Sequence, residues 1–511
     1  MLSSVLSCGL SGIDGFEVTV EVNLANGMPM FEIVGLPDAS VKESRERVRA
    51  AIRNSGYAFP AARLTVNLAP ADTKKEGPAF DLPIALATLC CLGILPPNAL
   101  NDLTVFGELS LDGSVRPVRG ALPMVISALE RGKKHLMLPM ENLNEVRCIE
   151  GISLYPVETL QAAIRHLTGQ LVIQPPEPIP YAQLLHNVEH MEDFKHVKGQ
   201  SSAKRALEIA AAGGHNVLLI GPPGSGKTLM ARCMPSILPD MTFSEALETT
   251  RIHSVAGTIP PSGLLTERPF RSPHHTASHA SLVGGGNNAL PGEISKAHNG
   301  ILFLDELPEY RRDVLEALRQ PLEDGFVTIT RVNAQATYPS RFVLIASMNP
   351  CPCGNLGSRT QQCRCTPAEI RRYLGRISGP LLDRIDMHIE VESIPAERLA
   401  DTAESESSAS IRARVSAARG IQQKRYESEK GKIRCNAQLD ARTLAHACVM
   451  TSEARELLLL SSDRMKLSNR AYTRILKVAR TIADHAGAEE IGAEHISEAV
   501  QYRTLDRKYW N

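Results

Sequence analysis

An eight-residue glycine-rich segment carries the clearest chemistry in the sequence. It reads GPPGSGKT and consists of Gly221, Pro222, Pro223, Gly224, Ser225, Gly226, Lys227 and Thr228. It fits the pattern G-x-x-x-x-G-K-[ST], in which glycines let backbone N–H groups turn inward around phosphates. The lysine of this pattern supplies a positive charge to the β- and γ-phosphates, and the threonine hydroxyl binds Mg²⁺. The segment therefore predicts a site for ATP and Mg²⁺, with all eight residues as nucleotide contacts.

Two adjacent carboxylates follow an apolar stretch further along the chain. Asp305 and Glu306 come directly after the run ILFL at 301–304. Two acidic side chains at the end of a buried strand cost free energy unless a metal ion and a water molecule use them. We therefore expect Asp305 to hold the magnesium ion together with Thr228, and Glu306 to orient or deprotonate the attacking water. These roles predict hydrolysis of the bound nucleotide.

Short apolar runs must position these residues. The run NVLLI at 216–220 precedes the phosphate-binding loop, and ILFL and FVLIA at 342–346 follow, separated by helical segments. Runs that are apolar throughout are typical of strands buried on both faces of a parallel sheet. The loop lies between such a strand and a helical stretch that begins at Thr228. We expect an α/β nucleotide-binding core over residues 195–393.

The chain has 511 residues, too many for one hydrophobic core, because cores stop growing at roughly 250 to 300 residues. Residues 1–172 alternate strand-like and helical stretches and predict a separate α/β domain. The segment QPPEPIP marks a linker over 173–194, since proline continues neither a helix nor a central strand. Residues 394–511 show helical spacing and predict a helical domain. The polar stretch AESESSAS at 403–410 is interpreted as an exposed linker.

Composition narrows the class of protein. The sequence is 43% hydrophobic and 22% charged, as in ordinary globular proteins. Its 56 basic and 56 acidic residues balance, so any nucleic-acid contact must come from local patches. The longest apolar runs, such as residues 84–91, are far shorter than the roughly 20 residues of a membrane-spanning helix. The first residues also lack the pattern of a secretory signal. We expect no membrane contact and a cytoplasmic protein.

The nucleotide-binding residues and their order resemble the AAA+ superfamily of ATPases. That resemblance implies that Asn349, at the end of the next buried strand, is a polar sensor of the γ-phosphate or the attacking water. In GPLLDRID at 379–386, Arg384 resembles the arginine finger that acts on a neighbouring subunit. Arg470 resembles the second sensor arginine of a helical lid, and Arg474, one turn later, is the competing choice. An ordinary strand-end asparagine and surface arginines are the alternatives.

The run RSPHHTASHASLVGGGNNALPGEISKAHNGILFLDELPEY at 271–310 resembles the magnesium-chelatase-like AAA+ group. The whole chain resembles the ComM/YifB family, which implies an AAA+ core, a helical carboxyl-terminal lid and a Lon-protease-like (ribosomal S5 domain 2-like) amino-terminal α/β domain. The resemblance also implies two insertions that point into the pore of a hexameric ring. One is a segment around 251–286 in the second core helix, and the other is a hairpin at 325–342. Alternation in Val327, Ile329 and Arg331 and the turn-forming Asn333 are consistent with that hairpin.

The Lon-like domain lacks the residues of a peptidase. KKEGPAFDLPIAL at 74–86 resembles the Lon segment with the nucleophilic serine, but Ala79 stands at the serine position. The segment at 107–142 resembles the one with the dyad lysine, and Leu122 occupies that place. An alanine methyl group cannot attack a carbonyl carbon. We therefore expect a non-proteolytic domain that serves binding or assembly.

One helix of this domain could contact nucleic acid. Four basic residues recur on one of its faces: Lys42, Arg45, Arg49 and Arg53. Like charges four residues apart mildly destabilise a helix, and a bound anion would relieve that repulsion. A solvated face, partly balanced by Glu43 and Glu46, is the simpler interpretation.

A cysteine cluster follows Asn349 in the pattern C-x-C-x9-C-x-C. It consists of Cys351, Cys353, Cys363 and Cys365. Four thiolates in one loop form a natural tetrahedral Zn²⁺ site, and the metal would order a segment that has little apolar content. Free or redox-active thiols and simple packing are the alternatives. For the nearby histidines 274, 275 and 279 we expect pore or interface contacts and no metal.

The family resemblance implies an ATP-dependent DNA motor: a helicase that promotes branch migration and integrates incoming single-stranded DNA during natural transformation. Its partners would be single-stranded and branched DNA, further copies of the chain and other recombination proteins. A second interpretation is a magnesium-chelatase subunit that helps insert Mg²⁺ into a porphyrin, and the Lon-like domain counts against it. A third is an ATP-dependent protease or unfoldase, which the missing dyad disfavours.

Overall fold

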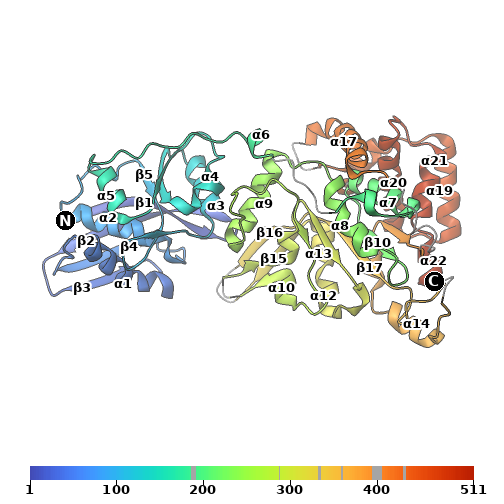
Figure 1. The fold of residues 1–511 in the computed structure, drawn as a ribbon, viewed down its shortest axis with the longest axis horizontal. Helices are drawn as coiled ribbons and strands as arrows, with labels where there is room; N and C mark the ends of the chain where they lie inside the picture. Colours follow the sequence, from blue (N-terminus) through green and yellow to red (C-terminus); the bar gives the residue numbers. More distant parts are fainter. Residues whose placement is uncertain are drawn as a thin grey trace.

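The computed structural model describes residues 1–185, 192–286, 288–331, 335–357, 361–393, 405–429 and 433–510. The amino-terminal domain, a central core and a helical region follow one another along the longest axis (Figure 1). Within the described residues, no helix combines the length and the apolar character needed to cross a membrane. The mixture of sheets and helices, with a parallel sheet in the core, confirms the predicted α/β class.

A seven-stranded sheet forms the amino-terminal domain, in the order β3-β4-β2-β1-β5-β8-β9. Its strands are β1 (Leu2–Ser11), β2 (Asp14–Ala25), β3 (Met30–Val34), β4 (Arg63–Ala69), β5 (Leu103–Val105), β8 (His135–Pro139) and β9 (Ser153–Val157). β2 runs antiparallel to β1 and to β4, and the other neighbours are parallel. In β2, the alternate residues Val18, Val20 and Val22 are fully buried, because one face of the strand lies on the core.

Helices and a short ladder complete this domain. They are α1 (Ala39–Asn54), α2 (Asp81–Cys91), α3 (Ala121–Glu130), α4 (Leu143–Val146), α5 (Leu160–Leu167), β6 (Glu108–Leu109) and β7 (Val115–Arg116). Ala79 and Leu122, which stand at the two dyad positions, belong to the same buried apolar cluster. Apolar packing therefore occupies the place where the resemblance would put a catalytic dyad.

The basic face of α1 is partly engaged within the chain. Lys42, Arg45 and Arg53 are exposed. The Arg49 guanidinium lies 5.5 Å from the centroid of the Phe59 ring, and its Nη1 lies 3.6 Å from a carboxylate oxygen of Glu46. Such contacts are those of a solvated helix face. Binding of nucleic acid by α1 stays a prediction.

Five parallel strands form the core, in the order β11-β14-β17-β10-β18. They are β10 (Val217–Ile220), β11 (Phe270–Arg271), β14 (Ile301–Leu304), β17 (Val343–Met348) and β18 (Met387–Glu390). Every residue of β10 and β14 is buried, which explains their uninterrupted apolar runs. Because the strands are parallel, the segments that follow β10, β14 and β17 meet at one edge of the sheet.

Helices pack around this sheet (Figure 1). They are α7 (Ser201–Gly213), α8 (Lys227–Ile237), α9 (Phe243–Ala256), α10 (His279–Val283), α11 (Glu293–Lys296), α12 (Arg312–Ala317), α13 (Arg319–Asp324), α14 (Pro367–Leu374) and α15 (Gly379–Leu382). The proline-rich segment QPPEPIP before the core has neither helix nor strand, and the short helix α6 (Tyr181–Leu184) follows it. Residues 186–191 of the predicted linker lie outside the described residues.

The insertion expected around 251–286 is smaller and begins later. Arg251 still belongs to α9, and Phe270 and Arg271 pair with β14 inside the central sheet. Near the end of the expected range, the two-stranded ladder of β12 (Gly284–Gly285) and β13 (Leu290–Pro291) lies between α10 and α11. The expected start at residue 251 was too early. The two-residue strand β11 leaves no apolar run in the sequence, so the sequence did not show that this segment belongs to the central sheet.

A hairpin lies within the predicted range 325–342. β15 (Phe326–Thr330) pairs antiparallel with β16 (Gln335–Pro339), and Val327, Ile329 and Tyr338 lie on its buried face. The turn residue Asn333 lies outside the described residues. A Cβ added at Gly284 would lie 2.5 Å from Cδ1 of Ile329, so this hairpin and the β12–β13 ladder pack directly on each other.

The carboxyl-terminal region is helical. Its helices are α17 (Ser408–Arg425), α18 (Ala441–Ala447), α19 (Ser452–Met465), α20 (Asn469–His485), α21 (Ala493–Gln501) and α22 (Leu505–Tyr509). The stretch 403–410 is only in part a linker, which corrects our interpretation: residues 403 and 404 lie outside the described residues, and Ser407 caps α17. Ser408 is buried and accepts a hydrogen bond of 2.7 Å from the Ser236 hydroxyl. Serine-rich stretches mark helix starts as well as linkers.

The amino-terminal domain docks on the core through α9. The Ser254 hydroxyl donates to the Glu145 carboxylate at 2.9 Å, and the Gly120 N–H donates to the Ser254 carbonyl at 3.1 Å. Asn142 donates to the other Glu145 oxygen at 2.7 Å. Burial raises the pKa of Glu145 to about 7, although the hydrogen bonds from Asn142 and Ser254 act in the opposite direction.

Glu145 makes this interface pH-dependent. In the unfolded chain its pKa is about 4.3. Its raised folded-state pKa adds stability that is fully present below about pH 4 and is lost as pH rises through about 7. We expect Glu145→Gln to raise the thermal stability at pH 8 and to flatten its decline between pH 5 and 8, as measured by calorimetry.

Glu141→Gln is the matched control, because it removes the same charge from an exposed position four residues earlier. The full effect at pH 8 is on the order of 3 kcal/mol. Equal pH profiles for Glu145→Gln and the native protein would show that Glu145 does not titrate in this range.

Candidate nucleotide site

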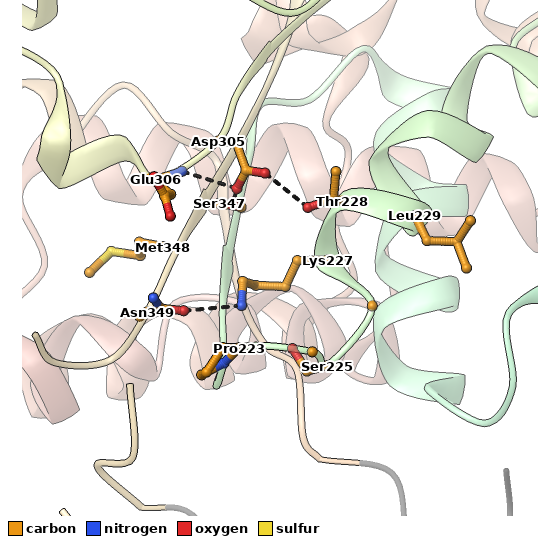
Figure 2. A pocket seen from close by; sticks show the side chains of 12 residues that line it. Pro223, Ser225, Lys227, Thr228, Leu229, Asp305, Glu306, Ser347, Met348 and Asn349 are labelled. Carbon is orange, nitrogen blue, oxygen red and sulfur yellow. Dashed lines mark hydrogen bonds between the residues drawn. The ribbon is translucent and has the colours of Figure 1, made fainter. Parts of the chain in front are cut away.

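The phosphate-binding loop lines a cavity of about 360 Å³ at the carboxyl edge of the core sheet (Figure 2). The loop leaves β10 at Ile220 and enters α8 at Lys227. Gly224 and Gly226 have φ angles of 74° and 91°, a region that side-chain-bearing residues rarely adopt. A Cβ at Gly221 would lie 2.2 Å from the Val391 carbonyl oxygen. The glycine positions of the motif thus follow from backbone conformation and close packing.

Lys227 points into the cavity from the first turn of α8. Its Nζ donates to the carbonyl oxygens of Gly221 and Pro222, both at 2.8 Å, and to Oδ1 of Asn349 at 3.3 Å. Burial lowers the pKa of Lys227 to about 8, although Asp305 and Glu306 favour its charged form. An anionic phosphate at this position would compensate the buried charge far better than neutral carbonyl groups do.

Asp305 links three segments of the site. Its Oδ2 accepts a hydrogen bond of 2.9 Å from the Thr228 hydroxyl, and its Oδ1 accepts from the Glu306 N–H at 3.0 Å and from the Ser347 hydroxyl. The structure therefore brings together the two predicted magnesium ligands, Thr228 and Asp305. A hydroxyl and a carboxylate oxygen are the donors that Mg²⁺ prefers. Ser347 was missed in the sequence, although a serine near the end of an apolar strand is a usable signal.

Glu306 reaches the same cavity with a side chain that is 56% exposed. Its φ of 54° places it in the left-handed region. A carboxylate oxygen of Glu306 lies 3.5 Å from Nδ1 of His275, whose ring lies at a tilt against that of His274 and meets the ring of Tyr310 edge-on. His275 was expected at a pore or an interface. Its position shortly after β11, beside β14, explains its contact with Glu306.

The three arginines predicted as finger and sensor residues lie away from the cavity. Arg384 and Arg470 both donate to the carboxylate of Glu323 on α13, and Arg474 donates to Asp386. Arg384 precedes β18, so it lies at the amino edge of the parallel sheet, whereas the cavity lies at the carboxyl edge. None of these arginines lines the cavity of its own chain within the described residues.

The four clustered cysteines lie close together beside the cavity. Their Sγ atoms are all within 4.8 Å of one another. Cys351 Sγ lies 3.4 Å from Cys353 Sγ and 3.6 Å from Cys363 Sγ. These separations exclude a disulfide bond, whose sulfur atoms are about 2.05 Å apart.

Comparisons with known proteins cover nearly the whole chain. The family model described as magnesium chelatase, subunit ChlI, matches residues 193–399, a second model for this subunit matches 20–142, and one for its carboxyl-terminal part matches 405–503. Competence protein ComM of Haemophilus influenzae is 43% identical over 508 residues, which cover 99% of this chain and 98% of ComM. The chain belongs to the ComM/YifB family of magnesium-chelatase-like AAA+ proteins. YifB of Escherichia coli K12 is 44% identical over 507 residues, 99% of this chain and 98% of that protein.

Lon protease 2 of Bacillus subtilis is also similar, at 25% identity over 175 residues. The match covers 31% of this chain and 30% of the protease. This likeness and the ComM/YifB membership agree with the predicted combination of an AAA+ core, a helical region and a Lon-like α/β domain.

The contact between His275 and Glu306 leads to a prediction about hydrolysis. If Glu306 acts on the attacking water as predicted, His275 beside its carboxylate restrains it, so His275→Ala should raise basal ATP hydrolysis. Contacts between partly exposed polar side chains contribute about 0.2 to 1 kcal/mol, which corresponds to an increase of about 1.5- to fivefold. A phosphate-release assay on the native protein and the variant measures the change.

His279→Ala is the control, because it removes an exposed histidine of the same segment, at the start of α10. A fall in hydrolysis in His275→Ala, with His279→Ala unchanged, would show that His275 assists Glu306 instead of restraining it.

Proposed function

We propose that this protein is a ring-forming ATPase that moves on DNA and promotes branch migration, integrating single-stranded DNA during natural transformation. The observation that carries the ATPase part is the meeting of Lys227, Thr228, Asp305, Glu306 and Asn349 in one cavity. The full-length similarity to a competence protein supports the DNA part. The same proposal places the protein in the cytoplasm, with recombination proteins as further partners.

In the proposed reaction each residue has one task. Lys227 would neutralise the β- and γ-phosphates, and Thr228 and Asp305 would hold Mg²⁺, which would supply further positive charge to the transferred phosphoryl group. Glu306 orients or deprotonates the water, and the Asn349 amide contacts the γ-phosphate or that water. ATP and Mg²⁺ are therefore the proposed cofactors. Zn²⁺, bound by the cysteine cluster, is a third proposed cofactor.

The position of the arginines supports a ring. Phosphoryl transfer needs extra positive charge on the transition state, and a neighbouring subunit often supplies it. Arg384 and Arg470 lie at the edge of the sheet opposite to the chain's own cavity. A neighbouring subunit packed against that edge would receive both arginines in its nucleotide site. We therefore assign Arg384 as the finger and Arg470 as the lid sensor, both acting on the next subunit, and infer a hexamer.

Two small hairpins, β12–β13 and β15–β16, are the proposed DNA-contacting elements. They pack on each other, and Arg331, at the end of β15, is exposed. A cation carried at a hairpin end suits a phosphate backbone, whatever its base sequence.

A magnesium-chelatase-type subunit that remodels a protein partner is the second candidate. The descriptions of the three family models favour it. One of them matches residues 20–142, so the amino-terminal domain no longer argues against this candidate. ATPase stimulation by a porphyrin-binding partner, without stimulation by DNA, would establish this second function.

The DNA proposal predicts ATP-dependent remodelling of forked and four-way DNA. Native protein should convert these substrates with ATP. Lys227→Ala should lose ATP binding, and Glu306→Gln should bind ATP but hydrolyse it at least about 100-fold more slowly, because it lacks the general base. Gel analysis of labelled DNA strands measures the conversion.

Lys74→Ala is the matched control, because it removes a lysine whose Nζ pairs with Glu76 on the surface of the other domain. Native protein that hydrolyses ATP normally but neither binds nor remodels any DNA form would contradict the DNA motor.

Action of Arg384 on a neighbour predicts complementation between two inactive variants. Lys227→Ala and Arg384→Ala proteins should each lack ATPase activity. After mixing and reassembly, a subunit with intact Lys227 can receive Arg384 from its neighbour, so about a quarter of the native rate should return.

Arg470→Ala in place of Arg384→Ala gives a second test with a more exposed side chain, and circular dichroism checks folding of each variant. Light scattering measures the mass of the mixed assembly. A mixture that has the mass of a ring but is as inactive as its components would show that the arginines act within their own chain.

A further inference from the structure

The cysteine cluster has the dimensions of a closed metal site. Four thiolates at about 2.3 Å from a tetrahedral Zn²⁺ ion lie about 3.8 Å from one another. The measured Sγ separations of 3.4 to 3.6 Å between Cys351, Cys353 and Cys363 are close to that value. Cys365 completes the set within 4.8 Å. Four sulfur ligands leave no open position for substrate, which is typical of a structural and not a catalytic zinc ion.

The loop backbone is shaped to support thiolates. The Leu356 N–H donates to Cys351 Sγ at 3.3 Å, and the backbones of Asn355 and Arg364 hydrogen-bond to Cys353. Gly354 and Gly357 have φ angles of 80° and 76°, which let the chain turn tightly around the sulfur atoms. Backbone donors aimed at the ligand atoms are the usual second layer of a metal site.

The same loop touches the nucleotide site in two places. A Cβ at Gly354 would lie only 2.6 Å from Cδ of Pro223 and 3.9 Å from Cγ of Asn349. Tyr373, on the helix α14 that begins two residues after Cys365, hydrogen-bonds to the backbone of Asn349. Asn349 itself lies two residues before Cys351 and accepts from Lys227. The loop is therefore packed between the phosphate-binding loop and the predicted sensor.

We propose that Cys351, Cys353, Cys363 and Cys365 bind one Zn²⁺ ion and that the metal-closed loop positions Asn349 and Pro223 for ATP hydrolysis. The positioning part rests on the proposed ATPase function. The sequence of this loop contains few apolar residues, so metal ligation would contribute free energy that fixes it. Loss of the metal should impair the step that needs Asn349 in place more than the binding of nucleotide.

The metal site is tested by elemental analysis of full-length protein purified without chelator. We expect one zinc per chain, loss of zinc in Cys351→Ser and Cys363→Ser, and unchanged zinc in Cys90→Ser, whose thiol lies in the amino-terminal domain. Co²⁺ added to metal-free protein should give the visible absorption of tetrahedral cobalt thiolate. Native protein without zinc, whose four thiols react with an alkylating reagent as readily before as after chelation, would overturn the inference.

The positioning role is tested by separating kcat from nucleotide binding. Chelation of zinc should lower kcat about tenfold, in the range seen when support of a site is removed, and zinc alone should restore it. The Kd for a fluorescent ATP analogue should change less than about threefold. Tyr373→Phe keeps all four thiolates and the aromatic ring but removes the hydroxyl that hydrogen-bonds to the backbone of Asn349, so it should retain zinc and still lose kcat.

The outcomes separate the two proposals. Equal kcat with and without zinc, or a zinc-loaded Tyr373→Phe variant with native kcat, would overturn the positioning role. A zinc-loaded native protein that binds ATP but does not hydrolyse it would instead contradict the proposed ATPase function and leave the metal site standing.

Discussion

The Asp305 carboxylate is the interaction on which the core depends. It receives the hydroxyl of Thr228 from α8 and that of Ser347 from β17, while its own backbone ends β14. This half-buried charge is tolerated because hydrogen bonds surround it and a cation is expected beside it. The bonds fix the loop relative to two strands, so the geometry of the phosphate site follows from the register of the parallel sheet.

Lys227 supplies the positive charge of the site, as Asp305 supplies the negative one. Its ammonium is buried among carbonyl oxygens, and its pKa falls to about 8. The loop thus holds a positive charge that neutral carbonyl groups compensate poorly, which favours binding of an anion. Stability given up at a functional site must come from elsewhere, here from the shared cluster in which α7 and α8 pack on carboxyl-terminal helices.

Sequence patterns predicted the α/β class, the buried strands β10, β14 and β17, and the meeting of Lys227, Thr228, Asp305 and Asn349 at one sheet edge, because these depend on local periodicity and parallel topology. The predictions failed where a strand is only two residues long or where a contact joins segments that are far apart in the sequence. Two-residue β11 left no apolar run, Ser408 was interpreted as linker instead of a buried helix start, and the contact of His275 with Glu306 joins segments separated by a strand. The roles of Arg384 and Arg470 stay predictions, since a neighbouring chain would have to complete them.

Glu323 gives these arginines a further meaning. In the single chain, one carboxylate pairs with both Arg384 and Arg470. Either guanidinium would have to leave it to reach a neighbour's phosphates, so Glu323 competes with the nucleotide for the same positive charges. In the proposed ring, ATP in the adjoining site would strengthen the contact between subunits by the same free energy with which that contact strengthens ATP binding. Nucleotide occupancy and assembly would then be coupled, and the ATPase rate per chain would rise with protein concentration.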